Sequence, residues 1–174
     1  LLNTARITVL TFGGGADDDV LDNRVGASIG SLDFTGDAGA DHIINRGAIG
    51  DSLTPGVLAL TFIGGADDDV LDNTGTITRL SFTGGADDDI LRNFGTIVTD
   101  LNFGGDTGAD GLLNVGTIAT LTFTGGADDD VLINNGTIAT LDFIGGDQDD
   151  VLINNGPVTV SLTFTGGADD DVLI

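Results

Sequence analysis

The feature that most constrains this chain is a unit of about 20 residues that recurs eight times. A Phe marks each copy, and a Leu stands two residues before every one; the eight positions are Phe12, Phe34, Phe62, Phe82, Phe103, Phe123, Phe143 and Phe164. A unit of this length cannot bury a hydrophobic face by itself, so the copies must stack on one another. The whole chain, 1–174, therefore reads as a single repeat array, and its mid-repeat ends predict a segment of a longer protein.

Each copy has a rigid half that begins at its Phe. Gly follows two residues later, Asp seven, Leu or Ile nine, and Asn eleven. Nearly all variation in length falls in the other half, where the commonest text is N-x-G-T-I-x-T-L-x-F, and residues 46–61 are expected to form a longer loop between coils. The rigid half is therefore held by something that the variable half lacks.

The alternation within each copy predicts the fold class. L-x-F and D-x-L-x-N have a period of two, which is typical of strands, and Gly-Gly and Asn-x-Gly are typical of corners. The chain has 29 Gly, and all of its 28 acidic residues are Asp, which favours turns and strands over helices. We therefore expect an all-β protein, a parallel β-helix or β-solenoid of about eight coils. A sandwich of hairpins would not place identical residues in register, and the pattern leaves a two-sided or three-sided coil open.

Two columns of identical residues are expected to be structural. Stacked coils place each Phe on the next Phe in the core, and each Asn on the next Asn at a corner, where the side chains can bond one another. The outward Asp beside each turn is expected to face solvent; these residues are Asp18, Asp68, Asp88, Asp129, Asp149 and Asp170.

The turn G-G-A-D-D-D-V-L, as in residues 64–71, resembles the calcium-binding nonapeptide of the RTX (repeats-in-toxin) proteins, G-G-x-G-x-D-x-U-x. The N-x-G-T-I half resembles repeats of bacterial autotransporter passengers and large adhesins. The RTX resemblance implies that Ca²⁺ is held by the sixth-position carboxylates, namely Asp19, Asp41, Asp69, Asp89, Asp110, Asp130, Asp150 and Asp171. This chain departs from that family by carrying Asp at most fourth positions and only one such turn per coil.

A physical argument about the same Asp series is independent of the resemblance. These residues share the parity of the inward Leu or Ile two positions later, so they should face inward near a corner. Like charges stacked about 4.8 Å apart repel by roughly 1–3.5 kcal/mol per pair. A cation, protonation or backbone N–H groups must therefore satisfy them, and calcium suits such oxygen ligands. The alternative is that they form Asx-turns and keep the protein soluble.

Charge and chemistry exclude several functions. A net charge of −23 argues against nucleic acid and anionic membranes as partners and favours cations. No stretch of the sequence is apolar enough for membrane insertion. The chain has no Cys and one His, and its carboxylates repeat identically, whereas a glycosidase needs two with different environments. We therefore expect a protein that is not an enzyme.

Three non-enzymatic functions remain open. The first is a structural segment of a secreted or cell-surface bacterial adhesin, rigidified by calcium ions, with a host-surface or matrix ligand as partner. The second is an extracellular filament or surface-layer subunit that self-associates end to end, because uncapped coils expose strand edges. The third is ice binding through outward Thr residues, against which Asp33, Ile63, Asp142 and Ile144 interrupt the array.

Overall fold

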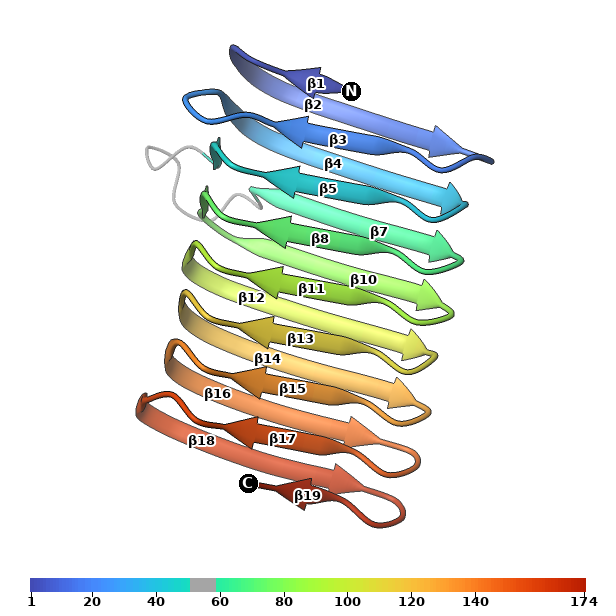
Figure 1. The fold of residues 1–174 in the computed structure, drawn as a ribbon, viewed down its shortest axis with the longest axis vertical. Coiled ribbons are helices and arrows are strands. Elements are labelled where there is room, and N and C mark those ends of the chain that lie inside the picture. Colours follow the sequence, from blue (N-terminus) through green and yellow to red (C-terminus); the bar gives the residue numbers. More distant parts are fainter. Residues whose placement is uncertain (51–58) are drawn as a thin grey trace.

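The computed structural model of the chain describes residues 1–50 and 59–174, and all regular structure in these residues is β-strand. Figure 1 shows the strands stacked along one axis, with the N-terminus in the coil at one end and the C-terminus in the coil at the other. The described residues form no helix, and so none that could cross a membrane.

Short strands build one of two sheets. Each corresponds to the D-x-L-x-N part of a copy, where an inward Leu or Ile and an inward Asn alternate with residues that face outward. In sheet order these strands are β1 (Leu2–Asn3), β3 (Val20–Asn23), β5 (His42–Asn45), β8 (Val70–Asn73), β11 (Ile90–Asn93), β13 (Gly111–Asn114), β15 (Val131–Asn134), β17 (Val151–Asn154) and β19 (Val172–Leu173).

Longer strands build the second sheet from the T-I-x-T-L-x-F-x-G part of each copy. Two copies split this stretch into a pair of strands. The members are β2 (Arg6–Gly15), β4 (Ser28–Ala38), β6 (Ala48–Ile49) with β7 (Leu60–Ala66), β9 (Thr76–Ile77) with β10 (Leu80–Ala86), β12 (Thr96–Thr107), β14 (Thr117–Ala127), β16 (Thr137–Gly146) and β18 (Val158–Gly167).

Every pairing in both sheets is parallel and joins equivalent residues of successive copies. Phe82 lies opposite Phe103 in the long-strand sheet, and Asn93 lies opposite Asn114 in the short-strand sheet. The predicted parallel β-solenoid of about eight coils is confirmed. The number of sides, which the pattern left open, is two, because each coil contributes to only two sheets.

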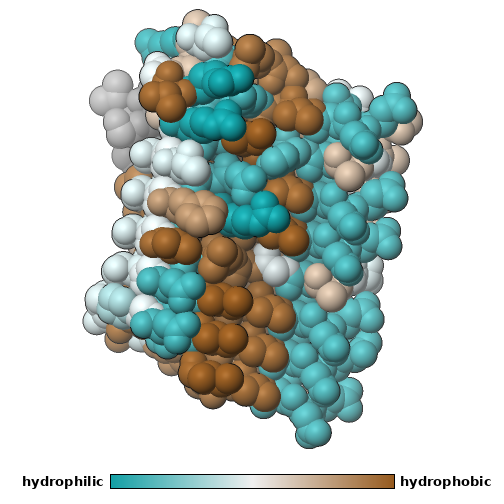
Figure 2. Space-filling model, in the orientation of Figure 1, coloured by the Kyte–Doolittle hydropathy of each residue, from teal (hydrophilic) through white to brown (hydrophobic). Residues whose placement is uncertain are grey.

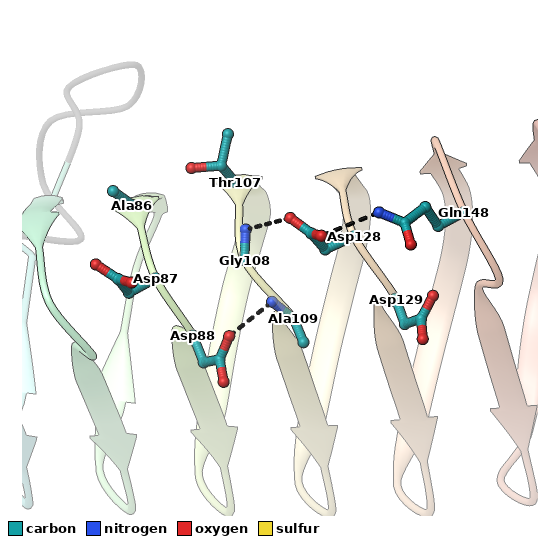
Figure 3. A pocket seen from close by; sticks show the side chains of 9 residues that line it. All are labelled: Ala86, Asp87, Asp88, Thr107, Gly108, Ala109, Asp128, Asp129 and Gln148. Carbon is teal, nitrogen blue, oxygen red and sulfur yellow. Dashed lines mark hydrogen bonds between the residues drawn. The ribbon is translucent and has the colours of Figure 1, made fainter.

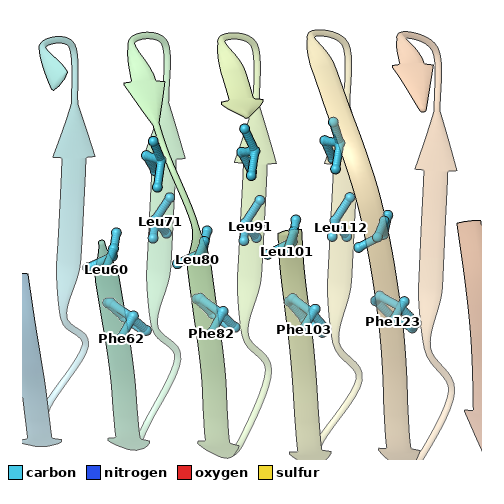
Figure 4. Close-up of a cluster of buried hydrophobic side chains, with 14 of the residues drawn as sticks. Leu60, Phe62, Leu71, Leu80, Phe82, Leu91, Leu101, Phe103, Leu112 and Phe123 are labelled. Carbon is cyan, nitrogen blue, oxygen red and sulfur yellow. The ribbon is translucent and has the colours of Figure 1, made fainter. Parts of the chain in front are cut away.

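The hydrophobic core fills the space between the two sheets. Leu and Phe from the long strands meet Leu from the short strands, as in Leu80, Phe82 and Leu91 (Figure 4). The eight Phe rings form one continuous stack, with centroids 4.7–5.2 Å apart and interplanar angles of 1–8°. The Phe column is therefore core packing, as expected.

From the second coil onward, the turn after each long strand keeps two residues with positive φ. In the common turn these are the second Gly and the Asp two residues later, such as Gly65 (φ 126°) and Asp67 (φ 71°). The two divergent turns exchange the residue types, so Asp37 (φ 76°) comes first and Gly39 (φ 106°) second. Gly and Asp are among the residues that adopt this conformation most readily, which explains the exchange.

The expected longer loop, residues 46–61, is only partly described. Ala48–Ile49 and Leu60–Ala66 lie in strands of the long-strand sheet. Residues 51–58 lie outside the described part of the chain.

Candidate functional site

The column of inward Asp residues is the candidate site. The structure buries Asp41, Asp69, Asp89, Asp110, Asp130 and Asp150, with at most 1% of each residue exposed. Asp19 and Asp171 are half-buried, because each lies in a terminal coil with a neighbour on one side only. The inward direction predicted from parity is confirmed, and the outward Asp series beside the turns is exposed, also as predicted.

One oxygen of each carboxyl group bonds the backbone of the preceding coil. The backbone N–H of Asp41 donates to Asp69 Oδ1 at 2.7 Å, and the N–H of Asp69 donates to Asp89 Oδ1 at 2.8 Å. The same bond recurs between all successive members of the column, at 2.7–3.1 Å. Each carboxyl group thus ties one coil to the next beside the turn.

The other oxygen packs against an invariant glycine. The Oδ2 atoms of the six buried residues have no hydrogen-bond partner and are inaccessible to solvent. A methyl group on Gly64 would overlap Asp69 Oδ2 and would lie 2.6 Å from the carbonyl oxygen of Gly84 in the next coil. Gly is required two residues after each Phe because the carboxyl group occupies the space of a side chain.

Burial dominates the electrostatics of the column. It raises the pKa of Asp69 to about 7, that of Asp89 to about 8, that of Asp110 to about 6 and that of Asp130 to about 7. The N–H bond from the preceding coil lowers each pKa, and neighbouring Asp residues raise it again. The pKa values of Asp41 and Asp150, one coil nearer the ends, are raised for the same reasons.

The geometry of the column does not fit the calcium site that the RTX resemblance implies. Calcium takes about six to eight oxygen ligands at roughly 2.3–2.6 Å. Here Oδ1 bonds a backbone N–H, Oδ2 packs against glycine backbone, and the described residues contain no group of three or more acidic, His or Cys side chains placed to hold a metal ion. These contacts do not themselves show a bound-calcium arrangement, and calcium binding by the inward Asp residues stays a prediction from the resemblance and the charge argument.

Sequence reasoning named these Asp residues but missed their glycine partners. The signal was present, because the Gly two residues after Phe and the Asp seven after it are both invariant at a fixed spacing of five. That spacing places them on facing sides of one turn, where the glycine makes room for the carboxyl group.

The Asn column forms a second ladder at the opposite corner. Asn73 Nδ2 donates to Asn93 Oδ1 at 2.7 Å, and Asn93 Nδ2 donates to Asn114 Oδ1 at 2.9 Å. The carbonyl oxygen of Asn93 also accepts the N–H groups of Val115 and Gly116. Donor and acceptor are thus both satisfied, and the predicted structural role of this column is confirmed.

A notch of about 470 Å³ lies at the exposed turn edge (Figure 3). It forms at one of the two divergent turns, where Gly108 and Ala109 stand in place of the paired Asp residues of the common turn. The surrounding carboxylates bond this small segment, since Gly108 N–H donates to Asp128 Oδ2 at 3.3 Å and Ala109 N–H donates to Asp88 Oδ1 at 2.8 Å. Its lining is acidic and includes no basic side chain.

The outward face of the short-strand sheet divides into two parts. Figure 2 shows an apolar stripe over the C-terminal coils, where Leu113, Val131 and Ile133 point outward, beside a hydrophilic turn edge. The N-terminal coils carry ion pairs instead, including Arg46 with Asp22 at 2.6 Å and Arg92 with Asp72 at 3.2 Å. These pairs are exposed enough to contribute little to stability.

Comparisons with protein-family models, curated proteins and solved structures gave no match to this chain.

Proposed function

We propose that this chain is a non-enzymatic structural rod, a repeat segment of a secreted or cell-surface bacterial adhesin. The observation that carries the proposal is the continuity of the internal ladders. The Phe stack and the Asp column run from the first coil to the last, and the Asn column joins eight successive strands of the short-strand sheet. A stalk needs such uniformity, whereas a catalytic site needs one coil that differs from the rest.

The same ladders suit a rod that bears load. Parallel backbone bonds join each coil only to its neighbours, so a chain pulled at its ends should open one coil at a time. The adhesive contact with a host surface or matrix would then be held at a fixed distance from the cell.

Single-molecule pulling between the two ends tests this function. We expect a series of force peaks, each releasing about 20 residues, on the order of 70 Å of extended chain. Release of the whole chain in one event at low force would contradict a load-bearing stalk.

Calcium enters as a second arm of the same measurement. If calcium rigidifies the rod, the peak force rises in excess Ca²⁺ and falls again in excess EDTA. Equal forces in both buffers would remove calcium from the proposal and leave the rod without a metal.

A filament is the second candidate, supported by the terminal coils. Phe12 and Phe164 are half-buried members of the same stack, so a second copy would extend the column in register. Sedimentation velocity of a polypeptide of residues 1–174 separates the two. Concentration-dependent polymers favour the filament, and a single 17.5 kDa species favours the stalk.

A further inference from the structure

The unpartnered oxygens of the Asp column require an explanation. Seven buried side-chain polar atoms in the described part of the chain lack a partner, and six of them are Oδ2 atoms of this column. A buried ionised oxygen without a partner is strongly unfavourable, and six in one row cannot be a local irregularity. Something must satisfy these atoms in every coil.

The space beside each Oδ2 limits what that can be. A Cβ atom built on Gly64 would overlap Asp69 Oδ2 and would lie 2.6 Å from the carbonyl oxygen of Gly84. The same arrangement recurs at Gly36, Gly105 and Gly145, each facing the Asp of its own coil and the glycine carbonyl of the next. A heavy atom at that position would overlap Oδ2, whereas a proton carried by Oδ2 adds no heavy atom beside the glycine.

We propose that the inward Asp side chains are carboxylic acids whose Oδ2–H groups donate to the glycine carbonyl oxygens of the next coil, so that the column is a proton-dependent hydrogen-bond ladder. Each Oδ1 continues to accept the N–H of the preceding coil. Every side chain then has one donor and one acceptor, as each Asn does at the opposite corner.

The charged groups around the column support this protonation state. Those that act on Asp89 are Asp110, Asp69 and Asp68, and those that act on Asp130 are Asp110, Asp150 and Asp128. For Asp69 and Asp110 the additional neighbours are again acidic, namely Asp41, Asp67, Asp88, Asp106 and Asp128. The ion pairs of Arg24, Arg46, Arg79 and Arg92 are with Asp22, Asp72 and Asp100, outside the column.

The ladder makes the stability of the rod depend on pH in a definite direction. Burial raises the folded-state pKa values to between about 6 and about 8 for the four central members, from 3.8 in the absence of the fold. Between these limits the folded state holds protons that the unfolded chain has released. Stability is therefore greatest below about pH 4 and falls as the pH rises toward 8.

Two matched variants test the ladder. Asp69→Asn/Asp89→Asn/Asp130→Asn replaces three inward acids by an amide, which donates and accepts as a protonated carboxyl group does. The control, Asp68→Asn/Asp88→Asn/Asp129→Asn, makes the same charge change at three exposed neighbours. Urea denaturation of both variants and of the unaltered chain is followed from pH 4 to pH 9 in excess EDTA.

The unaltered chain and the control are expected to lose stability steadily between pH 4 and pH 8. The inward variant is expected to show a shallower dependence and a higher urea midpoint than either at pH 8. An inward variant that is less stable than the control at every pH, or an unaltered chain whose stability rises with pH, would overturn the proposal. So would a calcium-induced stabilisation at pH 8 that the inward variant loses and the control retains.

Infrared spectroscopy keeps the proposal testable if the inward variant does not fold. The unaltered chain in heavy water at pH 6 is expected to show the C=O stretch of protonated carboxylic acids, which disappears on unfolding. A folded chain with only carboxylate bands at that pH would show that the column is ionised.

Discussion

At the scale of single residues, the pairing of Gly with Asp across each turn is the most specific feature of the molecule. The carboxyl group of Asp69 occupies the volume that a side chain on residue 64 would need, and its Oδ1 bonds the preceding coil. Gly64, which has no side chain, leaves the space that the carboxyl group of Asp69 fills. The rigid spacing of this half of the repeat follows from that pairing, because any insertion would separate the two.

Replacing Gly64 by Ala is expected to destabilise the protein by about 1–3 kcal/mol or more. The added methyl group would overlap Asp69 Oδ2 in a fully packed part of the core. The free energy of unfolding from urea titration at pH 6 measures the effect.

Gly104→Ala is the matched control, because its methyl group would meet only the Phe82 carbonyl oxygen, at 3.9 Å. We expect this change to stay within about 0.5 kcal/mol of the unaltered chain. Similar losses for both variants would contradict the assigned Gly64–Asp69 contact.

At the scale of strands, the Phe and Asn columns set the register between coils. A slip of one residue would turn every inward side chain outward and separate the stacked rings. The hydrogen bonds of the Asn column all run in one direction along the rod, since each side chain donates to the next coil and accepts from the previous one. The parallel pairing of strands that are 20 residues apart is therefore specified on both sides of the coil.

Asn93→Ala is expected to cost about 2–6 kcal/mol. It leaves the Nδ2 of Asn73 and the Oδ1 of Asn114 buried without their partners, and each unsatisfied group costs about 1–3 kcal/mol. Thermal melting and urea denaturation both report the loss.

The control is Asn135→Ala, at the exposed position that follows Asn134 of the column. There Asn155 Nδ2 donates to Asn135 Oδ1 at 2.9 Å in contact with solvent. Water replaces that bond, so little change is expected. If Asn93→Ala is equally mild, the buried Asn column does not stabilise the fold as described.

At the scale of the whole molecule, the solenoid places its charge where water can reach most of it. Of the 28 Asp residues, the inward column is buried, whereas the turn edge and the faces of the sheets carry exposed ones. The repeated design also means that each coil depends only on its two neighbours. Stability should therefore be close to a sum over coils and their interfaces.

Removal of residues 115–134 deletes one complete coil. It joins Asn114 to Asn135, so that Asn114 takes the place of Asn134 at the start of the next N-x-G-T-I stretch. We expect a folded rod with the same circular dichroism spectrum and a urea m-value lower by roughly an eighth, because less surface is exposed on unfolding.

Removal of residues 115–124 alone serves as the comparison. It takes out most of β14 and leaves the following turn without its strand, so this variant is expected to be unfolded. A folded product of the shorter deletion would show that the coil is not the unit of the structure.

The repeat by itself determined which residues stack and which side chains face inward. Fixed spacings of Phe, Asp, Leu and Asn, combined with a period of two, leave one register in which identical residues coincide, and the ladders follow from it. Parity likewise placed the Asp column inside, because a strand alternates its faces whatever lies around it.

Only the tertiary structure decided the number of sides and the contacts of each inward carboxyl group. The closure of each coil into two sheets depends on backbone angles at both corners, such as the positive φ of Gly65 and Asp67, which local patterns do not specify. The contacts of each Oδ2 atom involve the glycine of its own coil and a carbonyl group of the next coil. These contacts exist only after the coils have stacked, so the repeat spacing alone could not predict them.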